Sequence, residues 1–154
     1  MDFAIIVQEV DLSKYNYLKM PSSDTWGLIM RKDSPLAQKP FIQPEDLLDH
    51  PLICSRQSMT EEMQKWLGEM LDKLNIIATY DLLFNASVMV REGLGYALGF
   101  DNIIYTGQES PLCFRPLNPA LQSPMYIIWK KYQMFSKPAE KFIAILQESL
   151  ESQN

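Results

Sequence analysis

The sequence contains few of the residues that most often carry out chemistry. Among its 154 residues are one histidine, His50, and two cysteines, Cys54 and Cys113, which share no CxxC spacing. A structural zinc site needs four good ligands, and a nucleophilic serine or cysteine needs a base and an orienting acid beside it. The sequence also lacks a phosphate-binding loop and a dinucleotide fingerprint. We therefore expect no enzyme, no metal site and no cofactor.

Basic residues are outnumbered by acidic ones. The chain has 14 Lys and Arg against 19 Asp and Glu, which gives a net charge of −5. A domain that binds nucleic acid by itself usually presents a basic face to the phosphates. We therefore expect neither nucleic acid nor an anionic membrane surface to bind this chain directly.

Long apolar runs are also missing. No segment approaches the roughly 20 apolar residues that span a bilayer, and the first ten residues lack the basic start of a signal peptide. We expect a cytoplasmic protein in which both cysteines are reduced and buried. The 47% of apolar residues is enough for the core of one ordinary domain.

The hydrophobic pattern predicts alternating strands and helices. Short, apolar, β-branched runs predict strands, and apolar residues at i, i+3, i+4 and i+7 predict helices. The expected strands are 3–7, 25–31, 51–55, 76–84, 96–100, 113–117 and 125–131, and residues 8–24 are expected to form a loop with a possible strand at 17–20. The expected helices are about 59–74, one that starts at Asn85, and about 137–150. This alternation is typical of an α/β layer with parallel strands.

The predicted helix 59–74 has one apolar face. Ser58 stands three residues before Glu61, which is the spacing of a capping box. Met63, Trp66 and Met70 lie on the apolar face. Such a stripe belongs either to the core or to a surface that contacts a partner, and both interpretations remain open.

Polar and aromatic residues gather where two predicted strands end. Phe84, Asn85 and Ser87 stand at the expected start of a helix, and Phe100 ends the next strand. Ligands of open α/β sheets bind beyond the carboxyl ends of the strands, where helix N-termini offer free N–H groups. These four residues therefore predict a ligand pocket, although Asn85 may equally be a helix cap and the phenylalanines may be core.

A second predicted rim of that pocket follows the strand 51–55. Ser55, Gln57 and Ser58 can donate hydrogen bonds, and Arg56 can hold a carboxylate through a bidentate fork. Gln8 follows the first strand and would face the same cleft. The alternatives are a helix cap at Ser58 and a solvated surface charge at Arg56. One arginine among polar residues favours a small anionic or zwitterionic ligand.

Several stretches together resemble the effector-binding (substrate-binding) domain of LysR-type bacterial transcriptional regulators. They are "DFAII" at 2–6, "WGLIMRKDSPLA" at 26–37, "EDLLDHPLI" at 45–53, "VREGLGYALGF" at 90–100, and "MYIIWKK" at 125–131 followed by "SKPAEKFIAIL". The resemblance implies a periplasmic-binding-protein-like (type 2) α/β fold, in which two subdomains are joined by two crossing strands and an effector binds between them.

The resemblance also implies a domain organisation. Residues 1–26 would be a remnant of subdomain I, 27–125 a complete subdomain II, and 126–154 a crossing strand and a C-terminal helix that returns to subdomain I. The family's helix-turn-helix and the first part of subdomain I have no counterpart in this sequence. We therefore expect a truncated chain that exposes apolar surface and open strand edges, and that associates with itself as a dimer or with another protein.

Two functions are consistent with these features. The first is an effector-sensing domain that couples a small metabolite to DNA-binding geometry in the whole regulator, which would contact DNA through its helix-turn-helix. The alternative is a dimerisation or interaction module that no longer binds a ligand and uses Met63, Trp66 and Met70 as its interface. A solute-binding protein outside the cytoplasm would share the fold but would need a signal sequence.

Overall fold

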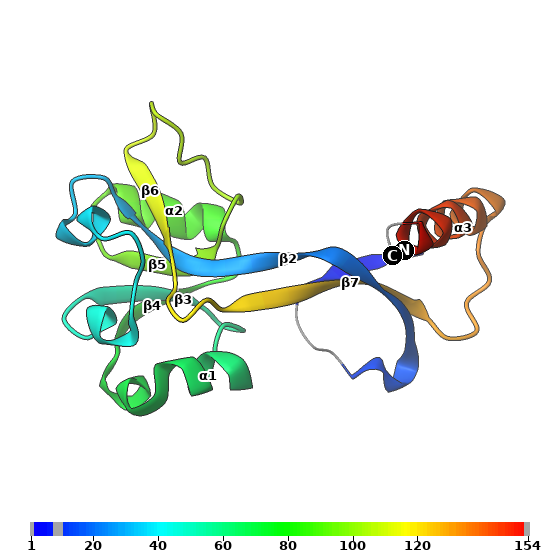
Figure 1. The fold of residues 1–154 in the computed structure, drawn as a ribbon, viewed down its shortest axis with the longest axis horizontal. Helices are drawn as coiled ribbons and strands as arrows, with labels where there is room; N and C mark the ends of the chain where they lie inside the picture. The colour runs from blue at the N-terminus through cyan, green and yellow to red at the C-terminus, as the bar shows by residue number, and fades with distance from the viewer. Residues whose placement is uncertain (1, 8–10, 153–154) are drawn as a thin grey trace. The chain divides into compact units, whose positions relative to one another are not determined.

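A computed structural model of the chain describes residues 2–7 and 11–152, and these residues form two compact units (Figure 1). One, here called the central unit, comprises residues 25–122. The other, the terminal unit, combines residues 1–24 with 123–154. Strand β2 (Tyr15–Arg31) contributes to both units.

The central unit contains a mixed sheet in the order β6-β2-β5-β3-β4. Its further strands are β3 (Pro51–Ser55), β4 (Asn75–Tyr80), β5 (Tyr96–Phe100) and β6 (Leu112–Pro116). Strand β3 is parallel to β4 and to β5, whereas β2 is antiparallel to β5 and β6. The carboxyl ends of β3, β4 and β5 therefore lie along one edge of the sheet.

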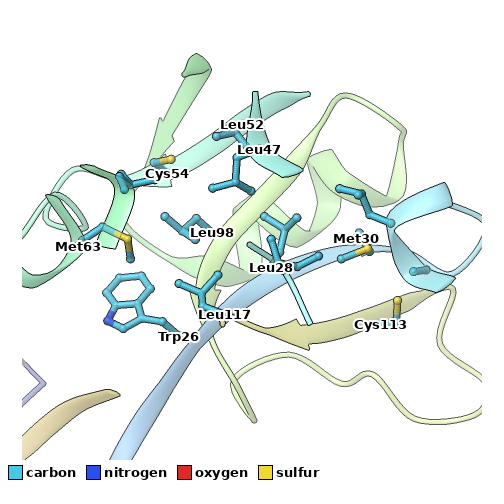
Figure 2. Close-up of a cluster of buried hydrophobic side chains, with 14 residues drawn as sticks. Trp26, Leu28, Met30, Leu47, Leu52, Cys54, Met63, Leu98, Cys113 and Leu117 are labelled. Carbon is cyan, nitrogen blue, oxygen red and sulfur yellow. The ribbon is translucent and has the colours of Figure 1, made fainter. Parts of the chain in front are cut away.

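Helices cover both faces of this sheet because the pleat sends neighbouring side chains to opposite sides. Leu28 and Met30 of β2 belong to one buried cluster, and Ile29 between them belongs to the other. Figure 2 shows the first cluster, where side chains of β2, β3 and β5 meet those of helix α1 (Glu61–Leu67) and of the 3-10 turn η3 (Pro44–Leu47). Helix α2 (Leu83–Arg91) covers the second cluster.

Short 3-10 turns complete the central unit. They are η2 (Pro35–Gln38) and η4 (Gly68–Lys73), in addition to η3. Ser34 caps η2 by accepting a hydrogen bond from the Leu36 amide at 3.3 Å. In η2 and η3 the cap is followed by a proline, Pro35 and Pro44. Proline suits the first position of a helical turn, where the N–H group would have no partner.

The terminal unit is a small sheet with one α-helix in the described residues. Strands β1 (Ala4–Ile6) and β7 (Gln122–Lys130) pair antiparallel, with Ile5 opposite Ile127, and β7 lies between β1 and β2. Helix α3 (Lys137–Glu151) packs its Phe142 ring 5.5 Å from that of Phe3. A 3-10 turn, η1 (Leu12–Lys14), precedes β2.

The structure corrects several predicted elements. Residues 15–24 form a strand throughout, where we expected a loop with only a possible strand at 17–20, because β2 runs unbroken from Tyr15 to Arg31. The predicted helix 59–74 is interrupted at Gly68, whose φ of 54° and ψ of −128° lie outside the helical region, and it continues only as η4. Thr60 rather than Ser58 caps α1, since the Thr60 hydroxyl accepts a hydrogen bond from the Met63 amide at 3.3 Å.

The predicted start of the next helix was also misplaced. Strand β4 ends at Tyr80, and α2 already begins at Leu83. Phe84 therefore lies in the helix and does not end a strand. Asn85 lies in the first turn of α2 and is not its cap, because Leu82 occupies the cap position and makes no side-chain capping bond.

Candidate functional site

The carboxyl ends of β3, β4 and β5 form a polar rim on the central unit. We call residues 55–58, Asp81 and Phe100 the strand-end rim. The turn after β3 is tightly bonded: the Ser58 amide donates to the Ser55 carbonyl at 3.1 Å, and the Gln57 amide donates to Ser55 Oγ at 3.2 Å. The Arg56 amide donates to the Tyr80 carbonyl at 3.4 Å, which joins this turn to the end of β4.

Arg56 provides the positive charge of the rim. Its Nε lies 3.7 Å from Asp81 Oδ1, and the two side chains are 70% and 76% exposed. A pair so exposed holds its partners weakly. The guanidinium is therefore accessible to a ligand carboxylate, for which it offers a planar fork of donors.

Two of the predicted donors are buried and already used. Ser58 is completely buried, and its hydroxyl donates to the Ser55 carbonyl at 2.7 Å. Ser87 is 2% exposed, and its hydroxyl donates to the Phe84 carbonyl at 2.6 Å. Both hydroxyls therefore have a structural role, because each donates its proton to a nearby backbone carbonyl. Ser55, at the end of β3, is half-buried.

The aromatic residues of the predicted pocket lie in different environments. Phe100 is half-buried at the rim, where its ring centroid is 4.1 Å from that of the buried Trp26. Phe84 is 66% exposed on α2. Asn85, next to Phe84, is also exposed. The sheet therefore brings Phe100 to residues 55–58 through the neighbouring strands β3 and β5, whereas Phe84 belongs to a second surface.

That second surface is a groove of about 470 Å³ between α2 and the loop that follows β5. We call it the α2 groove. It is lined by Phe84, Ser87, Arg91, Ile103, Ile104, Tyr105, Glu109, Ser110 and Pro111. Phe84 and Ser87 are predicted pocket residues, whereas the loop was not predicted. Its sequence signal is the two isoleucines and the tyrosine at 103–105 within an otherwise polar segment.

Burial shifts the pKa values of several groups in the central unit. Burial raises the pKa of the Cys54 thiol to about 11, and it also raises the pKa of Cys113. Burial raises the pKa of Tyr80 above its usual range, and the Tyr80 hydroxyl donates to the Leu98 carbonyl at 2.8 Å. These groups remain protonated at neutral pH, so neither thiol is an activated nucleophile.

The predicted interface residues are mostly inward-facing. Met63 is completely buried in the cluster of Figure 2, which leaves it no surface for a partner. Trp66 is half-buried against the same cluster, and its indole N–H donates to the Pro119 carbonyl at 2.8 Å. Met70 is half-buried. The Met and Trp stripe therefore contributes mainly to the core, as an amphipathic face packed on a sheet does.

Some predictions fall outside these surfaces. Gln8 lies outside the described residues. His50 is half-buried, with its ring centroid 4.7 Å from that of Tyr96. Within residues 2–7 and 11–152, no group of three or more His, Cys, Asp or Glu side chains is placed to hold a metal ion. None of the helices in this part of the chain combines the length and the apolar character that a membrane span requires.

Solved structures share this fold at low sequence identity. HinK, a LysR family transcriptional regulator from Pseudomonas aeruginosa, matches with a TM-score of 0.75 and 19% identity over 97% of this chain and 53% of its own. The CcmR regulatory domain of Synechocystis PCC6803 in complex with 2-PG matches with a TM-score of 0.73 and 18% identity, over 96% of this chain and 73% of its own. The effector binding domain of QuiR in complex with shikimate matches with a TM-score of 0.75 and 17% identity, over 93% of this chain and 68% of its own.

The chain is shorter than the whole regulators that it resembles. The chain spans about half the length of HinK and of a second regulator from the same organism, at 53% and 54%. No curated protein sequence matches the chain. The mixed α/β sheet with its helices is the periplasmic-binding-protein-like type 2 fold, as the sequence predicted.

The family model described as LysR substrate binding domain matches residues 1–151. This family consists of effector-binding domains of transcriptional regulators and not of enzymes. The resemblance found in the sequence is confirmed: the chain belongs to the family of LysR substrate-binding domains.

Proposed function

We propose that the chain senses a small anionic or zwitterionic metabolite through the strand-end rim. The supporting observation is the exposed Arg56 guanidinium, whose Nε lies 3.7 Å from Asp81. Arg56 stands at the carboxyl ends of the parallel strands β3, β4 and β5. This edge is where ligands of open α/β sheets bind. The effector domains of CcmR and QuiR, whose folds this chain shares, were solved with 2-PG and shikimate bound.

The rim suggests a division of roles. Arg56 binds the ligand carboxylate, and Ser55 and Gln57 donate hydrogen bonds beside it. Phe100 provides an apolar wall, and the buried Trp26 supports it from behind, with the two ring centroids 4.1 Å apart. Asp81 competes for Arg56 in the free protein and accepts an ammonium group of a zwitterionic ligand. Asn85 and Phe84 lie beyond this set on α2.

In the whole regulator, ligand binding would act through a population shift. We propose that the central unit corresponds to subdomain II and the terminal unit to part of subdomain I, and that the effector favours one arrangement of the two. A ligand shifts such an equilibrium only by its difference in affinity for the two states. The DNA contact belongs to a helix-turn-helix elsewhere in the regulator, and the regulator is proposed to be a cytoplasmic dimer.

Thermal melting tests the sensor directly. A ligand that binds only the folded chain raises the melting temperature, and the rise grows with the logarithm of the ligand concentration above Kd. We expect at least one member of a panel of small carboxylic acids, shikimate included, to raise it for the wild type and not for Arg56→Gln. Lys65→Gln is the matched control, because Lys65 is an equally exposed cation whose ion pair, with Glu61, lies on α1. A shift that persists in Arg56→Gln contradicts the proposed rim.

A second candidate function is that of an interaction module. It is favoured by the apolar side chains that the terminal unit exposes, among them Ile5 at 66% and Ile145 at 55%. Exposed apolar clusters mark surfaces that bind other proteins. Analytical ultracentrifugation separates the two functions: a mass that rises with concentration, together with no response to any acid of the panel, favours the interaction module.

A further inference from the structure

The α2 groove carries apolar side chains that the central unit leaves uncovered. Phe84 is 66% exposed, Ile103 57% and Tyr105 70%, and all three line the same groove of about 470 Å³. Contact with water is unfavourable for apolar side chains of this kind, so a cluster of them in a concave surface indicates a binding site. The volume lies in the range of small-molecule pockets.

The loop that forms one wall of the groove is anchored at several points. Ile104 packs against the buried cluster under α2, so Ile103 and Tyr105 on either side of it face outward. The Lys32 ammonium donates to the carbonyls of Gly107 at 2.7 Å and Gln108 at 3.1 Å. These bonds hold the backbone of the loop at the end of β2.

Gly107 places the tyrosine ring. A Cβ atom added at Gly107 would lie 2.4 Å from both Cζ and Oη of Tyr105. The ring therefore rests on the glycine backbone, at a distance that no other residue permits without displacing it. This contact places the Tyr105 ring along the wall of the groove.

Opposite charges line the same groove. Arg91 ends α2, four residues and therefore about one helical turn after Ser87. Glu109 lies in the facing loop. Both side chains are exposed, and neither forms an ion pair within the part of the chain that the structure describes. An apolar floor flanked by one cation and one anion matches a ligand with an apolar body, a carboxylate and an ammonium group.

We propose that the α2 groove is a second binding site, for a free amino acid with an aromatic or branched apolar side chain. The side chain lies against Phe84, Ile103 and Tyr105, Arg91 binds the carboxylate, and Glu109 binds the ammonium group. This site shares no residue with the strand-end rim and does not depend on the function proposed for it.

Titration calorimetry of the whole chain with L-phenylalanine tests this proposal. We expect saturable binding at one site, weakened at least about tenfold in Arg91→Gln and in Glu109→Gln, because each loses a charge-assisted hydrogen bond. Phenylacetate, which lacks the ammonium group, should bind more weakly and respond to Arg91→Gln but not to Glu109→Gln. Phenethylamine should show the opposite dependence.

Two further variants separate this site from the rim and from misfolding. Gly107→Ala displaces the Tyr105 ring and should weaken binding of L-phenylalanine, while Arg56→Gln should leave it unchanged. Equal melting temperatures of the variants show that each is folded. The proposal is overturned if phenylalanine, tryptophan and leucine all fail to bind at millimolar concentration, or if binding is lost in Arg56→Gln and retained in Arg91→Gln.

Discussion

The central unit and the terminal unit differ in how completely they bury their apolar residues. All twelve of the largest fully buried side chains in the described residues belong to residues 25–122. Among the residues of the terminal unit that the structure describes, the only buried ones are Ile127, Ile128, Ala139 and Ile143, and each keeps 4% to 8% of its surface exposed. Burial of apolar surface is the main favourable term in folding, so the central unit contributes most of the stability.

The two sheets explain this difference. The central sheet is covered by α1 and the 3-10 turns on one face and by α2 on the other. The terminal sheet has only α3 among its described residues, and the three-residue strand β1 forms its edge. A sheet with fewer layers has fewer places in which to bury apolar side chains, which is why Ile5 and Phe142 remain exposed.

The largest expected effect is a truncation in the central core. Leu98 is completely buried between both neighbouring strands of β5, so Leu98→Ala should lower the free energy of unfolding by about 2–5 kcal/mol. Ile143→Ala in α3 should cost less, because Ile143 keeps 8% of its surface exposed and belongs to neither of the two buried clusters. Urea unfolding followed by circular dichroism measures both. Equal losses would show that the terminal core is as well consolidated as the central one.

Alkaline pH should lower the stability of the central unit. Burial raises the pKa of Cys54 from 9.0 to about 11. Between these values the unfolded chain releases a proton that the folded chain keeps, so stability is fully present below pH 9 and falls as pH rises toward 11. The loss reaches at most about 3 kcal/mol. In Cys54→Ala this part of the decline should disappear, which urea unfolding at pH 8 and pH 11 can measure.

The thiol itself offers an independent measurement. Cys54 should react with a disulfide reagent at pH 8 only as fast as the central unit opens, since the buried thiol is protonated and covered. A burst of labelling at the rate of a free thiol in the folded chain would contradict both the burial and the pKa shift.

Much of the fold could be predicted from the sequence because its signals are local. Strands such as 51–55 and 96–100 are short apolar runs, and the structure places them within those bounds. The failures lie where a tertiary contact overrides the local pattern. Within the polar stretch 8–24 only residues 17–20 suggested a possible strand, yet all of residues 15–24 belong to β2, which neighbours β7 in the sheet.

The candidate site was predictable only in part, for a similar reason. The order of the elements places residues 55–58 and Phe100 at one edge of the sheet, as strand-end reasoning expects. The buried bonds of Ser58 and Ser87 could not be foreseen, because a hydroxyl at a helix start suits a ligand and a backbone carbonyl equally well. The α2 groove depends on a loop whose course has no periodic signal.

The smallest expected effect tests whether the exposed face of the terminal unit is covered in solution. Ile145 on α3 is 55% exposed, and Val88 on α2 is 41% exposed. Both are β-branched residues on helices, so Ile145→Lys and Val88→Lys form a matched pair. If both faces meet water, each substitution should change the free energy of unfolding by less than about 0.5 kcal/mol, and the mass in analytical ultracentrifugation should stay the same. A loss above about 1 kcal/mol in Ile145→Lys alone, with a fall in mass, would mean that a second copy covers the terminal unit. The difference between the units would then reflect an assembly whose terminal core is shared between chains.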